Sequence, residues 1–532
     1  MKACLNLNGL RRALTSLPKT LDDTYTRILC HIDETHYQYA LKILQWLVYS
    51  ARPLTLAELA EVIVIDVEGS PRCDPANRFP EPRDILKICS NLVALDSSVL
   101  DGMDVEKDDG SAQVVIRLAH FSVKEYLVSE RILQGNARRY NIQEISANIS
   151  IYNDCLAYLL EFELFDHCST SQCLAEFPLA DYAAKYWTKH AQIAEKHTGF
   201  NPNLTRELLL TKEDGLLNLV RLHNPEWPQG TVNPYLSLRE IHPPLYYVSM
   251  AGLHKSVQML LDEGVNVNAQ GGKHGNALHV ALEKGHIQIV QMLLDKGANF
   301  NALHKVHGTT LQIASVNGHI RIVQLLLDKG VDINAYDKKY GNALQSALAG
   351  GQLQVVQMLL DKGADVNAPD GKYGNALLIA SERGHTYIVQ ILLDKGADVN
   401  ASDGKYGNAL LIASERGHIQ IMEILLDKGA NINAPDMYYG TILQRESFKG
   451  HIRIVQILLD KGVDVNVRGG AYCNALQAAS IKGYIQIVQM LLDKGADVNA
   501  QGGEYGNALH AASKRGHTQV MQMLLRNGAI WR

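Results

Sequence analysis

Histidines recur at a fixed interval in this sequence, and a regular series of imidazoles could bind metal ions. They are separated by 33 or 66 residues: His286, His319, His385, His418, His451 and His517. A column of imidazoles could bind metal ions, because histidine is the commonest protein metal ligand. However, Gln352 and Tyr484 take the same position in two of the intervals, so no ligand role is shared by all. We therefore expect structural hydrogen bonding inside each turn, and no metal site.

Glycine-lysine pairs raise a second possibility, the binding of a nucleotide phosphate. Lys273, Lys372 and Lys405 are followed by His or Tyr, and they lack the upstream glycine of the pattern G-x-x-x-x-G-K-[ST]. The patterns G-x-S-x-G, H-E-x-x-H and H-R-D, typical of serine hydrolases, zinc peptidases and kinases, are also absent from the sequence. We therefore expect no enzyme, no cofactor and no nucleotide hydrolysis.

A cation precedes a recurring glycine at six of eight positions, Asn317 and Gly350 being the exceptions. The cations are Lys284, Arg383, Arg416, Lys449, Lys482 and Arg515. Stacked repeats would align them into a column that could bind an acidic segment of a partner protein. The alternative is that each cation only stabilises the end of its helix through the helix dipole. Glu382 and Glu415, each one residue earlier, would neutralise part of such a column.

Tyrosine recurs at a third position with the same 33-residue step. The series is Tyr340, Tyr373, Tyr406, Tyr439, Tyr472 and Tyr505. We expect these rings near loop tips, where they would join the cations in a protein-binding surface.

The element that must position these residues is a 33-residue unit, repeated nine times over 242–532. Gly252 and Gly264 each begin a series of nine glycines at this step. A fixed period of this length is typical of a solenoid, in which each unit buries its apolar face against its neighbours. In the second unit, Asn276 is predicted to cap a first helix that Gly285 ends, and a second helix over 287–296 precedes the capping Gly297. The remaining polar residues should form an extended, hairpin-like turn.

Two segments of the unit carry a family resemblance. Residues 276–281 read N-A-L-H-V-A and residues 363–368 read G-A-D-V-N-A. They resemble the T-P-L-H-x-A and G-A-D-V-N-A motifs of the ankyrin-repeat family, although Asn-Ala replaces Thr-Pro. The resemblance covers all nine units. It implies paired helices, and a partner bound at the concave face and the loop tips.

The seventh unit departs from the others. Glu446 stands where other units carry a small apolar residue such as Ala380 or Ala413. A buried carboxylate must stay wet, find a partner or protonate, because burying an unpaired charge is costly. The position indicates either a drifting repeat with a local adjustment or a hinge or binding notch. If the carboxylate is buried and unpaired, this unit is the weakest of the array and Glu446→Ala should stabilise it by about 1–2 kcal/mol.

The residues before the repeats predict a winged helix. A helix starting near Pro18, a second near residues 39–50, a third capped at Thr55 and a fourth beginning near Asp84 are followed by a strand pair, 93–96 with 114–118. The acidic stretch 103–112 would be the wing loop. Because the helix before the strand pair carries only Lys87 and the flanking Arg83 as basic residues, we expect it to pack against protein. A transcriptional regulator is the alternative.

A second resemblance appears in segments 17–29, 52–63 and 118–127. They look like segments downstream of the NACHT domain in fungal NACHT–ankyrin proteins, which are signal-transduction ATPases of the NOD-like receptor type. His120 matches a nucleotide-facing histidine of that family, while Phe121 replaces the aspartate beside it. Because the phosphate-binding loop is missing, we assign His120 no cofactor. The resemblance implies the sensor part of such a receptor without its ATPase.

Composition and charge complete the prediction. The net charge of −5 weighs against a general nucleic-acid binder. No secretory signal is apparent, the most apolar stretch is interrupted by charges and proline, and scattered cysteines favour an intracellular protein. We expect a mainly α fold: a helical remnant (1–36), a winged-helix domain (37–133), a helical spacer (134–241) and nine ankyrin repeats (242–532). The expected function is protein–protein recognition or scaffolding, with an unidentified partner and oligomeric state.

Overall fold

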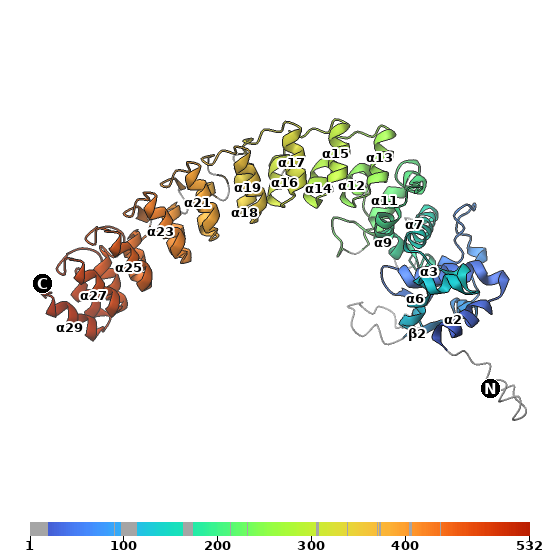
Figure 1. Ribbon diagram of the computed structural model, residues 1–532, viewed down its shortest axis with the longest axis horizontal. Coiled ribbons are helices and arrows are strands. Elements are labelled where there is room, and N and C mark those ends of the chain that lie inside the picture. The colour runs from blue at the N-terminus through green and yellow to red at the C-terminus, as the bar shows by residue number, and fades with distance from the viewer. Residues whose placement is uncertain are drawn as a thin grey trace, which may run out of the picture. The chain divides into compact units, whose positions relative to one another are not determined.

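The computed structural model divides into two compact units, Met1–Ala298 and Asn299–Arg532. The structure describes residues 20–89, 91–96, 114–162, 174–212, 214–230, 232–304, 308–337, 339–369, 371, 374–403, 407–436 and 438–531. Figure 1 shows helices throughout both units, with a small sheet near the start of the chain. The predicted mainly α fold is therefore confirmed.

The first unit begins with short helices around a three-stranded antiparallel sheet of order β1-β3-β2. The Thr55 side chain caps α4, and the Glu58 carboxylate accepts a hydrogen bond from the Thr55 N–H, so the predicted cap is confirmed. The strand pair is also confirmed, with Val93 opposite Leu118. The short strand β1 was not predicted, and the expected fourth helix is a 3₁₀ turn followed by one α-helical turn. The elements are α2 (Leu21–Cys30), α3 (Tyr37–Tyr49), β1 (Leu54–Thr55), α4 (Leu56–Val62), α5 (Leu86–Cys89), β2 (Val93–Asp96), β3 (Val115–Leu118) and α6 (Phe121–Val128). The predicted wing loop lies outside the described residues.

Four further helices are described in the same unit, and α7 shares buried polar contacts with α3. Asp154 accepts a hydrogen bond from Trp46 Nε1 at 2.9 Å and forms an ion pair with Lys42 at 2.8 Å. A buried carboxylate is tolerated here because it has two donors. The helices are α7 (Glu144–Glu161), α9 (Ala180–Ala194), α10 (Asn203–Arg206) and α11 (Gly215–Leu222).

His190 on α9 makes the stability of this unit depend on pH. Its ring lies 3.0 Å from the Tyr182 hydroxyl and 2.7 Å from Asn148 Oδ1. Burial, with a smaller contribution from Lys189, lowers the pKa of His190 to about 4 from 6.5. The unfolded chain therefore binds a proton near pH 6.5, whereas the folded chain binds it only near pH 4. The stability is fully present above pH 6.5 and is lost as the pH falls toward 4.

We expect the free energy of unfolding of this unit to fall by up to about 1.4 kcal/mol per pH unit in that window. Denaturant titrations followed by tryptophan fluorescence at several pH values measure this slope. The control is His190→Gln, which retains polar groups but does not titrate. A slope that the substitution leaves unchanged would assign the pH dependence to other groups.

Nine helix pairs follow along the described chain, as the glycine spacing predicted. The first two pairs belong to the first unit: α12 (Pro244–Met250), α13 (His254–Asp262), α14 (Ala277–Lys284) and α15 (Ile287–Asp295). Asn276 caps α14 by accepting from the His279 N–H, and Gly285 ends it with φ of 78°. The predicted cap and stop signals are therefore confirmed.

The second unit stacks seven further pairs, which are numbered here as repeats three to nine (Figure 1). They are α16 (Thr310–Val316), α17 (Ile320–Asp328), α18 (Ala343–Gly350), α19 (Leu353–Asp361), α20 (Ala376–Glu382), α21 (Thr386–Asp394), α22 (Ala409–Arg416), α23 (Ile419–Asp427), α24 (Ile442–Lys449), α25 (Ile452–Asp460), α26 (Ala475–Lys482), α27 (Ile485–Asp493), α28 (Ala508–Lys514) and α29 (Thr518–Arg526). The predicted hairpin-like turn is visible where β4 (Ser402–Asp403) pairs with β5 (Gly407–Asn408), and again where β6 (Pro435–Asp436) pairs with β7 (Gly440–Thr441).

The two helices of a repeat differ in burial. In α22 six consecutive residues are buried, beginning at Ala409, whereas α23 buries only Ile421, Met422 and Leu425. The first, or inner, helix is sandwiched between the inner helices of adjacent repeats, and the second, or outer, helix buries a single stripe. Each core is thus completed by neighbouring repeats, as expected for a solenoid.

Candidate interaction surface

Several of the recurring histidines connect successive repeats. His418 Nε2 lies 3.1 Å from the carbonyl oxygen of Glu382, and His517 Nε2 lies 3.1 Å from that of Ile481. Gln352 replaces the imidazole and donates to the carbonyl of Val316 at 3.4 Å. At these three positions the expected structural hydrogen bond is present, and its partner is a backbone carbonyl of the preceding repeat rather than a group within the same turn. The series is not uniform: His451 Nδ1 contacts Glu446 of its own repeat, and His385 Nε2 is buried without a hydrogen-bond partner among the described residues.

The column cations of the second unit also contact the preceding repeat. Arg416 Nη2 pairs with Glu382 Oε1 at 2.5 Å, and Lys449 Nζ with Glu415 Oε1 at 3.5 Å. Arg383 donates to the carbonyl of Ala349. These contacts span 34 residues, so they join adjacent repeats at the ends of their inner helices. Arg383, Arg416 and Lys449 therefore stabilise the stacking before they are available to any partner.

The remaining members of the column face aromatic rings or a neighbouring cavity. Lys482 Nζ lies 4.3 Å from the centroid of the Phe448 ring, and Arg515 Nη2 donates to the Tyr505 hydroxyl at 3.3 Å. In the first unit, Lys284 lines a cavity of about 250 Å³ together with Trp187 and Tyr247.

The described tyrosines of the recurring series differ in how far their rings are exposed. Tyr340 is only 7% exposed, so its assignment to a binding surface is corrected: the ring is buried and cannot serve as a docking group. Tyr439, Tyr472 and Tyr505 are half-buried. Tyr373 and Tyr406 lie outside the described residues.

Two aromatic residues belong with this series although the sequence analysis did not select them. Tyr438 is 72% exposed, with its ring centroid 5.5 Å from that of Tyr439. Phe448 stacks on Tyr472 at 4.4 Å with an angle of 17° between the ring planes. Phe448 could have been found, because it replaces Glu415 of the preceding repeat at a fixed spacing of 33 residues.

Glu446 is fully buried and has three side-chain partners. Its Oε1 lies 3.0 Å from Arg445 Nε and accepts from the Ser414 hydroxyl at 3.2 Å, while its Oε2 lies 2.5 Å from His451 Nδ1. Arg445 is buried too, and it donates to the Leu411 carbonyl. The sequence left three alternatives for this carboxylate, which were to stay solvated, to find a partner or to protonate. The structure shows that it has partners. The condition for a stabilising Glu446→Ala substitution is not met.

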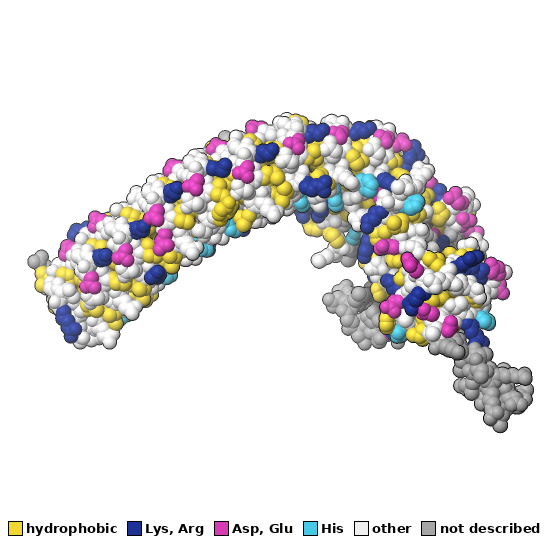
Figure 2. Space-filling model, viewed as in Figure 1, with side chains coloured by type: hydrophobic (Ala, Val, Ile, Leu, Met, Phe, Trp, Pro, Cys, Tyr) yellow, Lys and Arg dark blue, Asp and Glu magenta, His cyan; other side chains and the backbone are white. Residues whose placement is uncertain are grey.

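The outer helices carry a separate charge ladder. Lys428 pairs with Asp394 at 2.8 Å and Lys494 with Asp460 at 3.3 Å, and Lys461 pairs with Asp427 between them. Figure 2 shows Lys/Arg and Asp/Glu side chains alternating along the second unit. Because the two signs alternate, this ladder presents no extended field of one charge.

His120 has a local structural role. It is the N-cap of α6, its Nδ1 accepts from the Ser122 N–H at 3.2 Å, and its ring contacts that of Phe121 with the two planes at 40°. These contacts account for the histidine without a nucleotide.

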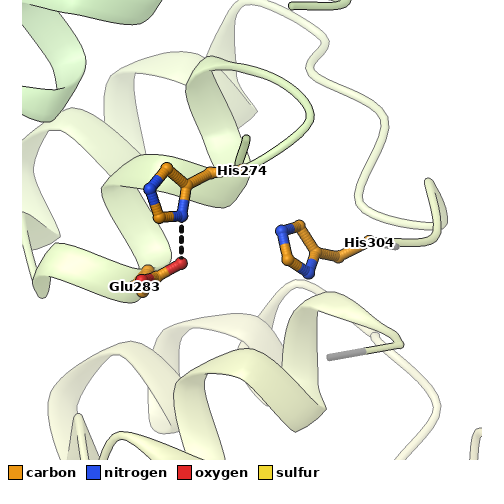
Figure 3. Close-up of side chains that lie close together, drawn as sticks. All are labelled: His274, Glu283 and His304. Carbon is orange, nitrogen blue, oxygen red and sulfur yellow. Dashed lines mark hydrogen bonds and ion pairs between the residues drawn. The ribbon is translucent and has the colours of Figure 1, made fainter. Parts of the chain in front are cut away.

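A loop of the first unit is held by another histidine. His274 Nδ1 lies 2.5 Å from Glu283 Oε2 on α14 (Figure 3). The His274 ring also stacks with Tyr246 at 6.4 Å. The loop that enters the second repeat is therefore fixed to the inner helix of that repeat.

Comparison with known families decides the identity of the repeats. The family described as "Ankyrin repeats (3 copies)" matches residues 212–304, 301–370, 369–436 and 443–531. The chain belongs to the ankyrin-repeat family. The ankyrin match begins at residue 212, within the segment that the sequence analysis assigned to the helical spacer.

The N-terminal part has a separate match. Residues 27–138 match the family described as "GPI inositol-deacylase, winged helix domain", in agreement with the sheet and helices around β3. Among the described residues, no helix is both long enough and apolar enough to cross a bilayer.

A relative of this ankyrin-repeat protein is "Azaphilone pigments biosynthesis cluster protein L" of Monascus ruber. The two are 37% identical over 295 residues, which is 53% of this chain and 60% of the relative. The matched segment thus spans less than two thirds of the relative's length.

Proposed function

We propose that this ankyrin-repeat protein recognises a partner protein through the inner-helix ends and loop tips of its repeats, without catalysing a reaction. One observation carries the proposal: the repeats bury their apolar residues against one another, while cations recur at the ends of the inner helices with the period of the repeat and half-buried tyrosine rings recur in the last three repeats. A solenoid of this kind offers an extended recognition surface. The contact residues that we propose are Lys284, Lys482, Arg515, Tyr439, Tyr472 and Tyr505.

We further propose that this protein is related to NACHT-type signalling receptors. Its support is the resemblance of segments 17–29, 52–63 and 118–127, together with the winged-helix match. On this basis, residues 1–36 are a remnant following a NACHT-type domain, 37–133 a winged-helix domain, 134–241 a spacer and 242–532 the ankyrin array, in an intracellular protein.

A DNA-binding regulator is less well supported. The helix before the strand pair, α5, has four residues, and Lys87 on it pairs with Asp84 at 2.6 Å. A recognition helix that inserts into the major groove needs exposed side chains over several residues, including cations.

Cross-linking of the full chain in native cell extract tests the proposal. With a lysine-reactive reagent, we expect cross-links from the partner to inner-helix lysines such as Lys482 and Lys514. The matched control is the outer-helix set Lys428, Lys461 and Lys494, which should acquire few cross-links. Partner cross-links confined to residues 20–241, or to the outer helices, would contradict recognition by the inner edge.

A further inference from the structure

The cation column changes character at the seventh repeat. In repeats five and six, the residue before the column cation is Glu382 or Glu415, and each carboxylate pairs with the cation of the next repeat. In repeats seven and eight, the corresponding residues are Phe448 and Ile481. The position that neutralises Arg416 and Lys449 therefore supplies no carboxylate to the last two column cations, Lys482 and Arg515.

Where the carboxylates end, aromatic rings take their place. Tyr438, Tyr439, Phe448 and Tyr472 form one contiguous group, which we call the aromatic shelf. Besides the stacked Phe448–Tyr472 pair, the Tyr439 centroid lies 5.5 Å from that of Phe448 and 6.3 Å from that of Tyr472. Tyr438 is exposed and the other three rings are half-buried. Aromatic groups that stay partly open to solvent are typical of protein-binding surfaces, because they bury large areas at a low cost in conformational entropy.

Three cations adjoin the rings at this end of the array. Lys482 lies over Phe448, Lys514 Nζ lies 5.0 Å from the Tyr505 ring centroid, and Arg515 contacts the Tyr505 hydroxyl. Within the part of the chain that the structure describes, none of the three cations forms an ion pair. A lysine ammonium has three donors, so its contact with a ring face leaves donors for a carboxylate.

We propose that repeats seven to nine bind an acidic linear segment of the partner protein. An apolar side chain of that segment packs on the aromatic shelf, and flanking carboxylates pair with Lys482, Lys514 and Arg515. The choice of an acidic segment rests on charge complementarity. Lys482 lies over the Phe448 ring of the shelf, and Lys514 and Arg515 contact Tyr505 in the ninth repeat; none of the three forms an ion pair among the described residues. The inference rests on the proposed function and restricts it to one part of the array.

A library of random linear peptides displayed on phage, selected against the full chain, tests this inference. We expect enriched peptides to combine Asp or Glu with a large apolar residue. Synthetic copies, measured by fluorescence anisotropy, should bind more weakly as salt increases, because exposed ion pairs are screened.

Single substitutions in the full chain locate the binding. Phe448→Glu installs the residue type of Glu415, which can pair with Lys482 as Glu415 pairs with Lys449, and should weaken peptide binding by about tenfold or more. Lys482→Gln should weaken it in the same direction. The matched control is Arg416→Gln, at the same column position but already paired with Glu382, which should leave peptide affinity unchanged.

Three outcomes would overturn the inference: no enriched peptides, enriched peptides without acidic residues, or equal affinity for wild type and Phe448→Glu. The cross-linking experiment separates these failures from failure of the proposed function. If partner cross-links to inner-helix lysines persist in the Phe448→Glu chain, the repeats still recognise the partner, but the aromatic shelf does not contribute to that recognition.

Discussion

Glu446→Ala is expected to lower the free energy of unfolding of the second unit by about 3–5 kcal/mol, the usual cost of removing one partner from a buried ion pair. The substitution leaves the Arg445 guanidinium buried, with a Glu415 carboxylate oxygen at 3.8 Å from its Nη1. It also removes the partner of His451, whereas the Ser414 hydroxyl keeps the Leu411 carbonyl as an acceptor at 2.9 Å. Denaturant titration followed by circular dichroism measures the loss, and hydrogen exchange should place it in α24 and α25.

A double substitution is the control for this prediction. Arg445→Ile with Glu446→Ala restores the Ile-Ala pair that repeats five and six carry at 379–380 and 412–413. Replacing a buried ion pair by apolar residues of fitting shape is often neutral or stabilising by about 1–4 kcal/mol. We therefore expect the double variant to equal or exceed the wild type in stability. A double variant as unstable as Glu446→Ala would show that the ion pair is not the source of the loss.

Gly384→Ala is expected to destabilise the second unit more than the same substitution one repeat later, at Gly417. Both glycines have φ of 75°, and a left-handed conformation costs alanine about 1–2 kcal/mol at either site. At Gly384, a Cβ would also lie 2.8 Å from His418 Cε1, whereas at Gly417 nothing lies within 4 Å. The space at Gly417 is open because His451 turns toward Glu446.

The additional loss at Gly384 should be about 1–3 kcal/mol, since the ring must move and its bond to the Glu382 carbonyl breaks. The two variants and the wild type are compared by denaturant titration under identical conditions. Equal losses at the two positions would mean that the imidazole adapts without cost. The histidine would then contribute little to repeat stacking.

Much of the fold was predictable from residue types and spacing. The cap at Asn276, the stop at Gly285 and the 33-residue period are local features, and local conformational preferences determine them. The strand pair near Val93 was predictable for the same reason. The role of β1 was not, because a two-residue strand acquires its identity only from pairing with β3.

The candidate surface was less predictable. A column of cations was visible in the sequence, but its division into paired and unpaired members depends on contacts between residues 34 positions apart. Tyr340 and Tyr439 occupy equivalent positions, yet one is buried and the other is part of the shelf, because their neighbours in adjacent repeats differ.

The sequence alone determined that the chain is an array of paired helices with a winged helix before it, since capping, helical periodicity and repeat length are encoded within each unit. Only the tertiary structure decided whether Glu446 is paired, whether Arg416 is neutralised and where Lys482 meets an aromatic ring. The physical reason is that charge neutralisation and burial depend on the distance to side chains of neighbouring repeats, and stacking sets that distance.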